Sequence, residues 1–581
     1  MSEKVYSGKK GTRSSSTRAS INRISNRKPP GRRSFECDTE AVSRLAKKLK
    51  SATSKDDIEV DSAFGYRIVN FIHVFTMLSQ ILVCQNCAGN VTFSESCIRG
   101  LGFKIVVQCE KCGSTTIDSS PLINGNAFDI NRRFIFAMRL IGIGMQGIHK
   151  FCAFMCLPKP VTQNSYDKIV KCIAIATDAV KCKVLREAVE EEKKISVEKG
   201  QHEGLSVSGD GSWRKRGFSS LFGFSSLIGW FTGKVIDIFV KSKYCKGCEH
   251  WEKQKNTAEY EEWKNVHENN CQVNHSGSAG KMESDAIVEM FSRSESTCNV
   301  RYAYYIGDGD SKTYKSIQDA KPYGDFPVTK KECIGHVQKR IGTRLRNLKK
   351  EAKHLGGRGK LTGKLIDEMS IYYGLAIRRN IDSIDNMRKE IYATLYHKIS
   401  TDENPQHDRC PEGEDSWCSW QRAKASHTLE LYTHKPAMPM QVFDAVQPIY
   451  KDLTREDLLS RCLGGFTQNA NESLNSIVWS IAPKTISSGK TVVDIATDIA
   501  VITFNCGFQG LLDVMSTFQL KINTQLYNFV MEVDRRRVTA ANRSASNNLK
   551  NTRKDLASLR KEAQEQNECL EGQLYGAGIA E

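Results

Sequence analysis

The sequence has no apolar segment near its start of the kind that directs secretion, because residues 1–31 are rich in lysine, arginine and serine. It also has no apolar run typical of a membrane span: the longest, 134–157, includes Arg139 and Lys150, which favours a core helix. Internal repeats are absent as well. We therefore expect a protein of a reducing compartment with no membrane partner, whose 20 cysteines are to be considered first as zinc ligands rather than as disulfides.

Acidic residues are fewer than basic ones, 66 against 84, which gives a formal charge of +18. Such a surplus favours polyanion partners, since each phosphate that a protein neutralises releases counterions. The alternative is a basic protein whose lysines are merely solvated. With 40% hydrophobic and 26% charged residues, the 581-residue chain has the composition of a globular protein of several domains.

The composition and the apolar pattern of the sequence change along the chain, and these changes predict its domain organisation. The basic cluster Arg27–Arg33 is typical of a nuclear-entry signal, a phosphate-binding arm or an ordinary solvated tail, and we expect the nucleus as the location. The expected segments are a basic disordered tail (1–60), a zinc-ribbon-like module (61–125), a helical segment (126–204), the first part of a catalytic core (205–340) with a Cys/His excursion (244–280), an inserted helical region (341–460), the end of the core (461–535) and a charged tail (536–581).

Three short apolar runs separated by glycine-containing turns, 205–207, 219–229 and 234–240, predict the adjacent strands of a meander. After the polar excursion, a helix is expected over 281–294 and another strand over 301–306. Three strands, a helix and a strand that ends in an acid describe the first half of an RNase H-like core. The sequence therefore predicts an α/β fold.

Three acidic residues are candidates for a catalytic metal site. Asp210 and Asp308 each follow a strand-like run, and Glu472 stands at the start of an apolar helix. Two carboxylates at the ends of adjacent strands can share a hard divalent cation such as Mg²⁺. Two such metals would serve phosphodiester chemistry by activating the attacking oxygen and stabilising the leaving one. The alternative is that aspartates followed by glycine simply form turns.

The first cysteine cluster has zinc-ribbon spacing. Cys84 and Cys87 form one Cys-x-x-Cys pair, and Cys109 and Cys112 form a second pair after a spacer with two β-like segments. Two such pairs bring four thiolates into a tetrahedron around Zn²⁺. We expect a structural zinc here, with buried free cysteines as the alternative.

A second cluster lies in the excursion, where Cys245, Cys248 and Cys271 provide three thiols. His267 and His275 compete for the fourth position, and we prefer His267. This set also suits zinc.

A third set consists of His407, Cys410 and Cys418, accompanied by Trp417 and Trp420. Zinc binding is one interpretation, and packing around the tryptophans, or their stacking on nucleic-acid bases, is the other.

A basic stretch at 339–350 is a candidate for a helix that faces phosphates. The residues that we expect to bind DNA are Lys339, Arg340, Arg344 and Arg346. The alternative is a solvated helix face.

Four stretches resemble, in order, the motifs of the Mutator-like transposase domain family. Residues 208–217 are similar to its first-aspartate motif, 306–312 to its second, 333–340 to its Cys-x-x-His element and 471–479 to its glutamate helix. The resemblance extends over roughly residues 60–540. It implies an RNase H-like catalytic core, helices inserted before the glutamate, and cut-and-paste DNA transposition.

The resemblance also implies roles for individual residues. Asp210, Asp308 and Glu472 would hold catalytic Mg²⁺ or Mn²⁺. Asp310 is an alternative second ligand, and we favour Asp308 because it follows the strand directly. Cys333 and His336 would support the DNA or the geometry of the active site; two ligands alone do not complete a zinc site.

The expected function is therefore that of a transposase that cleaves and joins DNA. Its partners would be double-stranded terminal inverted repeats and target DNA, and a homo-oligomer is expected because two transposon ends must be brought together. One alternative is a domesticated, non-catalytic, zinc-containing DNA-binding protein. The other is a stand-alone RNase H-like nuclease, which would need neither the zinc ribbon nor the long insertion.

Overall fold

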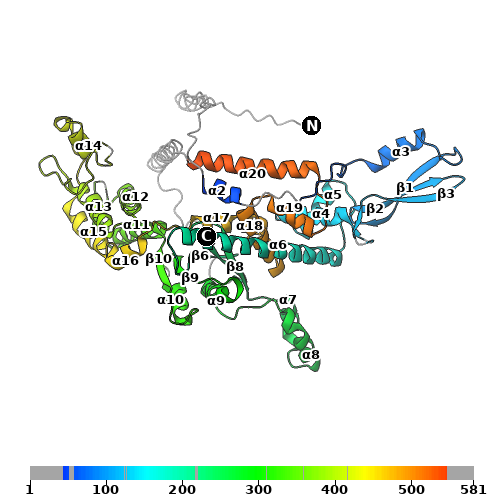
Figure 1. The fold of residues 1–581 in the computed structure, drawn as a ribbon, viewed down its shortest axis with the longest axis horizontal. Helices are drawn as coiled ribbons and strands as arrows, with labels where there is room; N and C mark the ends of the chain where they lie inside the picture. Colours follow the sequence, from blue (N-terminus) through cyan, green and yellow to red (C-terminus); the bar gives the residue numbers. More distant parts are fainter. Residues whose placement is uncertain are drawn as a thin grey trace, which may run out of the picture. The chain divides into compact units, whose positions relative to one another are not determined.

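The computed structural model describes residues 43–51, 58–123, 125, 127–215, 220–308, 311–357, 359–414 and 416–545 (Figure 1). Residues 44–537 form one compact unit, the larger of the two into which the chain divides. Most of the predicted basic tail (1–60) and most of the charged tail (536–581) lie outside the described residues, and so does Asp310. The sheets, the helical insertion and the candidate sites all belong to the larger unit.

A mixed five-stranded sheet lies at the centre of this unit, with the strand order β10-β9-β6-β7-β8. Its strands are β6 (Leu205–Trp213), β7 (Phe222–Gly229), β8 (Val235–Ser242), β9 (Tyr302–Gly307) and β10 (Thr329–Glu332). The first three are antiparallel neighbours, whereas β9 runs parallel to β6 and β10 runs parallel to β9. The predicted α/β class is confirmed, and the strands expected from the sequence are present.

Both faces of the sheet are covered, and its central strands are therefore largely buried. Ile228 and Val235 belong to a core shared with the long helix α6 (Gln163–Glu198) and with α18 (Lys490–Cys506). Their neighbours Leu227 and Ile236 belong to a separate core on the other face, shared with α9 (Lys281–Cys298). This alternation follows from side chains that point to opposite faces along each strand.

The segment before the central sheet contains a second sheet and several helices. Strands β1 (Val91–Arg99), β2 (Gly102–Cys109) and β3 (Gly113–Asp118) pair antiparallel in that order. The elements around them are α2 (Arg44–Ser51), α3 (Phe71–Ile81), the short hairpin β4 (Leu122–Ile123) and β5 (Ala127–Phe128), α4 (Asp129–Leu140) and α5 (Met145–Phe154).

The apolar stretch 134–157, expected as one core helix, is divided between α4 and α5. The break follows Leu140, and Gly142 adopts a positive φ of 78° there, a conformation that glycine reaches without strain. No helix in the described ranges is both long and apolar enough to cross a membrane.

A helical insertion separates β10 from the helix that carries Glu472. It consists of α11 (Ile334–Glu351), η3 (Lys353–Leu355), α12 (Gly363–Arg379), α13 (Ile384–Tyr396), η4 (His397–Ile399), α14 (Ser419–Ala425), η5 (Leu429–Leu431), α15 (Met440–Leu453) and α16 (Glu456–Cys462). Apart from α14 and η5, these helices contribute to a hydrophobic core of their own. The two ends of the insertion meet where the Ile334 amide donates to the Phe466 carbonyl over 3.0 Å.

The remaining elements flank these parts. Between β8 and α9 lie α7 (Lys246–Trp251), η1 (Glu252–Gln254), α8 (Ala258–His267) and η2 (Glu268–Asn270); α10 (Ser311–Ala320) follows β9; and α17 (Asn469–Ile481), α19 (Gly510–Thr517) and α20 (Thr524–Ala545) belong to the C-terminal part.

Candidate functional site

The two candidate aspartates lie on neighbouring parallel strands. In the β6–β9 pair, Ser208 stands opposite Ile306. Asp210 is two residues beyond Ser208, and Asp308 is two residues beyond Ile306, immediately after β9 ends. The shared register therefore brings the two carboxylates to the same edge of the sheet.

The surroundings of Asp210 disfavour its charged form. Burial raises the pKa of this carboxyl to about 6 against the hydrogen bond that Asn475 donates, and the charge of Asp308 raises it as well. A cation between the two carboxylates would offset both the burial and the mutual repulsion. The donor set of carboxylate oxygens matches what Mg²⁺ and Mn²⁺ prefer.

Helix α17 is held against β6 by polar side chains. Gln468 donates to the Gly209 carbonyl over 2.7 Å, Asn475 donates to Asp210 Oδ2 over 2.7 Å, and the Trp479 indole donates to Ser212 Oγ over 2.7 Å. These residues recur every three to four positions once Asn471 is included, so they form one face of the helix. The residues around Glu472 therefore attach α17 to β6, the strand that carries Asp210.

Asn471 is the most deeply buried member of that face, with none of its surface exposed. Its amide donates to the Ser208 carbonyl over 3.1 Å and to Ser226 Oγ over 3.3 Å, and it accepts from Ser208 Oγ over 2.7 Å. It joins α17 to both β6 and β7.

Glu472 lies on the flank of the same face, four residues after Gln468 and three before Asn475, and its side chain is exposed. Among the described residues, the carboxylates of Asp210, Asp308 and Glu472 are not all within 4.8 Å of one another, in contrast to three groups of cysteines and histidines. The structure therefore brings the two aspartates together and places the glutamate on the adjoining helix.

Cys333 and His336 stand beside the aspartates. The Cys333 amide donates to the Gly307 carbonyl over 3.2 Å, one residue before Asp308. Hydrogen bonding to the Cys333 sulfur raises the pKa of His336, and the charge of Asp308 contributes in the same direction. Burial raises the pKa of the Cys333 thiol, but the hydrogen bonds from His336 and Gln468 and the charge of His336 together outweigh burial, so that the net change in pKa is downward. The charge of the second aspartate therefore acts on the His336 imidazole and favours its protonation.

The first cysteine cluster is assembled by two tight turns. One lies between α3 and β1, and the other lies between β2 and β3. Cys84 Sγ is 3.8 Å from Cys112 Sγ, and Cys87 Sγ is 3.4 Å from Cys109 Sγ. Backbone N–H groups of Asn86 and Cys87 lower the pKa of Cys84 to about 6, which favours the thiolate that a metal needs. The four sulfurs all lie within 4.8 Å of one another, as a metal-binding group requires.

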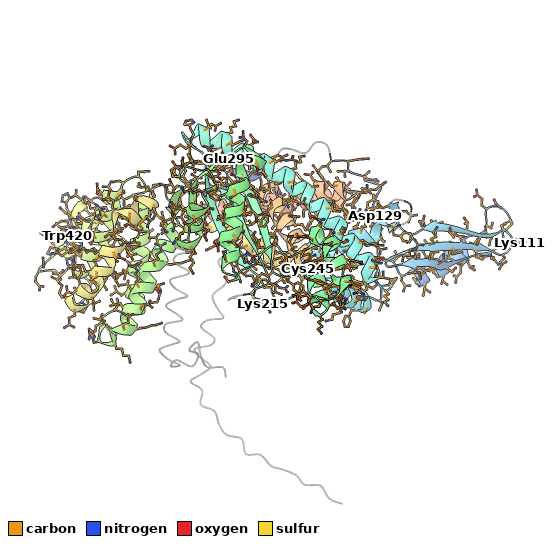
Figure 2. The ribbon with its side chains drawn as sticks, turned by 90° about the horizontal axis from the view of Figure 1, so that it is seen from below. Lys111, Asp129, Lys215, Cys245, Glu295 and Trp420 are labelled. Atoms are coloured by element: carbon orange, nitrogen blue, oxygen red, sulfur yellow. The ribbon has the colours of Figure 1, made fainter. Side chains whose placement is uncertain are left out.

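The second cluster consists of Cys245, Cys248, His267 and Cys271 (Cys245 is labelled in Figure 2). His267 Nε2 is 3.4 Å from the sulfurs of both Cys245 and Cys248. His275 lies elsewhere: its Nε2 is 3.0 Å from the Ser278 carbonyl oxygen and its Nδ1 is 3.3 Å from Asp285. Of the two histidines that the sequence left open, the structure groups His267 with the cysteines.

The third cluster contains a residue that sequence reasoning missed. His407, Cys410 and Cys418 lie together as a group, and His397 joins them. His397 lies ten positions before His407, which is too far for a short ligand pair to be recognised. The only local signal is a second histidine upstream of the Cys-rich segment, in the short helix η4 that follows α13.

The basic stretch 339–350 lies on α11, and three of its four candidate arginine and lysine side chains already have acidic partners. Arg340 pairs with buried Glu332 at 2.6 Å, Arg346 pairs with Asp367 at 2.6 Å, and Arg344 pairs with Asp452. Lys339 is exposed and makes no ion pair in the described part of the chain. Sequence reasoning did not foresee these partners, because two of the three acids come from other helices.

Comparison with known proteins supports one family. No curated protein matches the chain. The family model described as "Mutator-like transposase" matches residues 65–418, which is more than half of the 581 residues. The matched part includes both aspartates, the Cys333–His336 element and the cysteine clusters, and it ends before Glu472. The chain therefore belongs to the Mutator-like transposase family.

Proposed function

We propose that this protein is a DNA transposase that cleaves DNA strands and transfers them with Asp210, Asp308 and Glu472. The observation that carries the proposal is the parallel pairing of β6 and β9, which brings Asp210 and Asp308 to one edge of the sheet. The hydrogen bond from Asn475 to Asp210 links the helix of the third acid to the same edge.

The sheet supports an RNase H-like core for this site. The antiparallel meander β6–β7–β8 is continued by the parallel strands β9 and β10 on the side of β6. Helix α9 connects β8 to β9 and covers one face, and the insertion α11–α16 separates β10 from the helix of Glu472. In this proposal the domain boundaries are those expected from the sequence.

The roles of the side chains follow from their surroundings. When bound, Mg²⁺ or Mn²⁺ would lower the pKa of the attacking water or 3′-hydroxyl and stabilise the leaving oxygen. Asp210 and Asp308 would hold the metal between them, and Asn475 would keep Asp210 oriented. Glu472, exposed on the flank of α17, would complete the site from that helix. His336, when protonated, would add positive charge near Asp308 and the phosphate.

The first cluster, which contains Cys84, and the second cluster, which contains Cys245, fit structural zinc. In both, four side-chain donors from two short chain segments converge, which leaves no position open for a substrate. We propose that the first is a zinc ribbon and that the second stabilises the excursion formed by α7 and α8. Both would keep surface modules folded that have little hydrophobic core.

The partner would be double-stranded DNA, including the terminal inverted repeats and the target. The formal charge of +18 supports a polyanion. Transposition joins two ends, so we propose a homo-oligomer, and access to chromosomal DNA implies the nucleus.

A domesticated, non-catalytic DNA-binding protein is the second candidate. Two observations favour it: Glu472 lies outside the part matched by the family model, and its carboxylate is not gathered with the aspartates. In that case the cysteine clusters and the basic surface would remain functional, while the three acids would have no catalytic role.

Cleavage of a duplex taken from the flanks of the gene separates the two candidates. The wild-type chain, Asp210→Asn and the control Asp385→Asn are compared in Mg²⁺, in Mn²⁺ and in a chelator. Asp385 is a suitable control because its side chain is 91% exposed. A transposase cuts in metal, fails with Asp210→Asn and tolerates Asp385→Asn. A protein that binds the duplex but cuts in neither metal is the domesticated form.

A further inference from the structure

The inserted helical region contains a buried group of metal-ligating side chains that the catalytic proposal does not use. We name it the His397 cluster: His397, His407, Cys410 and Cys418. His397 comes from η4, His407 and Cys410 from the loop after it, and Cys418 is the N-cap residue of α14. Cys418 is fully buried, and His407 and Cys410 are 1% and 4% exposed. Three of the four donor residues are thus buried and His397 is half-buried, so water can satisfy few of these groups.

The separations between the donor atoms match a tetrahedral zinc site. His397 Nδ1 is 3.1 Å from His407 Nδ1, and Cys418 Sγ is 3.7 Å and 3.4 Å from these two nitrogens. Cys410 Sγ is 3.9 Å from each nitrogen. A tetrahedron with Zn–N near 2.1 Å and Zn–S near 2.3 Å has donor separations of about 3.4–3.8 Å. Hydrogen bonding among thiols and imidazoles alone would not require all four atoms to converge on one point.

The ring nitrogen of His407 that faces away from the cluster has its own partner. His407 Nε2 is 2.9 Å from His434 Nε2, and His434 Nδ1 is 2.6 Å from Asp402 Oδ1. If Nδ1 of His407 binds a metal, its Nε2 carries a proton and donates to His434. His434 then carries its proton on Nδ1 and donates to Asp402. Each ring N–H in the series His407, His434 and Asp402 then has an acceptor. Such outer hydrogen bonds orient histidine ligands in metal sites.

We infer that the His397 cluster binds one structural Zn²⁺ through His397 Nδ1, His407 Nδ1, Cys410 Sγ and Cys418 Sγ. His434 and Asp402 act as positioning residues for His407. Two sulfurs and two imidazole nitrogens are ligands that suit zinc rather than magnesium or calcium. All four positions are taken by the protein, so the metal is structural, and the two thiols lose their protons when it binds.

The consequence is a rigid attachment of the segment 397–434 to the helical insertion. Trp420, labelled in Figure 2, stacks on His407 with ring centroids 4.8 Å apart and an interplanar angle of 15°. Trp417 packs against His397 at 5.2 Å and against Tyr372 of α12 at 5.4 Å. The metal would thus fix two tryptophans that belong to a segment of loops and short helices.

Counting the zinc bound by the full-length chain tests this inference. Zinc per chain is measured by elemental analysis and native mass spectrometry for wild type, Cys418→Ser and the control Cys462→Ser. Cys462 is also fully buried in the helical insertion, but it belongs to none of the Cys/His groups of the described chain. We expect Cys418→Ser to hold one zinc fewer than Cys462→Ser. Equal zinc contents in the two variants would overturn the inference, whatever the total.

The positioning residues give a readout that does not remove a ligand. His434→Gln keeps all four donors, so it should still bind the zinc when the metal is saturating. Its affinity, measured by competition with a chelator, should fall about 10- to 100-fold, as is typical when an outer partner of a ligand is lost. An unchanged affinity would remove His434 and Asp402 from the site.

Wild-type protein provides a test that needs no variant to fold. Cysteine alkylation is mapped by mass spectrometry with zinc, with a chelator, and after zinc is restored. Cys410 and Cys418 should be protected in zinc, become modified in the chelator and be protected again on restoration, while Cys462 should not respond. Identical modification of Cys410 and Cys418 in all three conditions would contradict the inference.

Discussion

The side-chain amide of Asn475 donates a hydrogen bond of 2.7 Å to Oδ2 of Asp210. This contact joins two segments that lie 265 residues apart in the sequence. It fixes the rotamer of the first candidate ligand from the helix that also carries Glu472. The position of the Asp210 carboxylate therefore depends on α17 as well as on the central sheet.

Asn475→Leu should weaken metal-dependent cleavage without removing a ligand. Asp210 would lose the donor that holds it, so the apparent affinity for Mn²⁺ should fall about 10- to 100-fold, with part of the rate recovered at high metal. The measurement is the cleavage rate as a function of Mn²⁺ concentration. Ser476→Ala, at the next and exposed position of the helix, serves as the control. A variant with the wild-type metal dependence would show that Asn475 has no positioning role.

Lys339 should contribute more to DNA affinity than Arg344 does. Lys339 is exposed, whereas Arg344 is paired with Asp452 and must leave that partner to contact a phosphate. Lys339→Gln should reduce the slope of log affinity against log salt by about 1, as expected for one lost phosphate contact. Arg344→Gln should change the slope less. Binding isotherms over a range of salt concentrations test both, and a larger effect of Arg344→Gln would reverse the ranking.

Zinc content should distinguish the two histidines near the second cluster. His267→Ala removes a donor that lies 3.4 Å from two sulfurs, so the chain should lose one zinc ion. His275→Ala should retain that zinc, because His275 contacts Ser278 and Asp285 instead. Both variants are compared by elemental analysis of the purified full-length protein. Loss of zinc from His275→Ala alone would assign the fourth ligand to the other histidine.

Asp498 should make stability depend on pH. Burial raises its pKa from 3.8 to about 6, even though Lys181 lies 3.0 Å from the carboxylate and lowers it. Between pH 4 and 6 the folded protein therefore binds more protons than the unfolded chain, and the free energy of unfolding falls as pH rises through this window. Each unit of pKa difference corresponds to about 1.4 kcal/mol.

Asp498→Asn removes this titration, so wild type should lose stability relative to the variant between pH 4 and 6. The readout is denaturant or thermal unfolding of both proteins across that window, with exposed Asp385→Asn as the control. A difference between wild type and Asp498→Asn that stays constant with pH would show that the carboxyl is not perturbed.

Much of the central sheet could be predicted because its strands are buried on both faces and stand out as apolar runs. Strand β10 could not be predicted, since it consists of Thr329, Lys330, Lys331 and Glu332 at the edge of the sheet. Edge strands carry charged residues that discourage pairing with other chains, so they lack the apolar pattern. Strand β3 was not predicted either, because all six of its residues are exposed and it therefore lacks an apolar pattern.

The residues of the candidate site could be named from motifs, but their partners could not. Asn475, Asn471 and Gln468 attach α17 to β6 across more than 250 residues of sequence, and no local pattern reveals such contacts. The same holds for the acid that pairs with Arg344, which is 108 residues away. Spacing rules found the ligand pairs that are close in sequence, and they missed His397 because its contribution depends on how η4 folds back onto the loop.

Single-turnover cleavage by three carboxamide variants is the measurement that decides whether the acids act together. Asp210→Asn, Asp308→Asn and Glu472→Gln are compared with wild type in Mn²⁺, and duplex binding is measured on the same preparations. If the three acids share the metal site, each variant should lose cleavage by at least about two to three orders of magnitude while binding DNA almost as well as wild type. Retention of wild-type cleavage by Glu472→Gln, or by either aspartate variant, would contradict an Asp-Asp-Glu site in this protein.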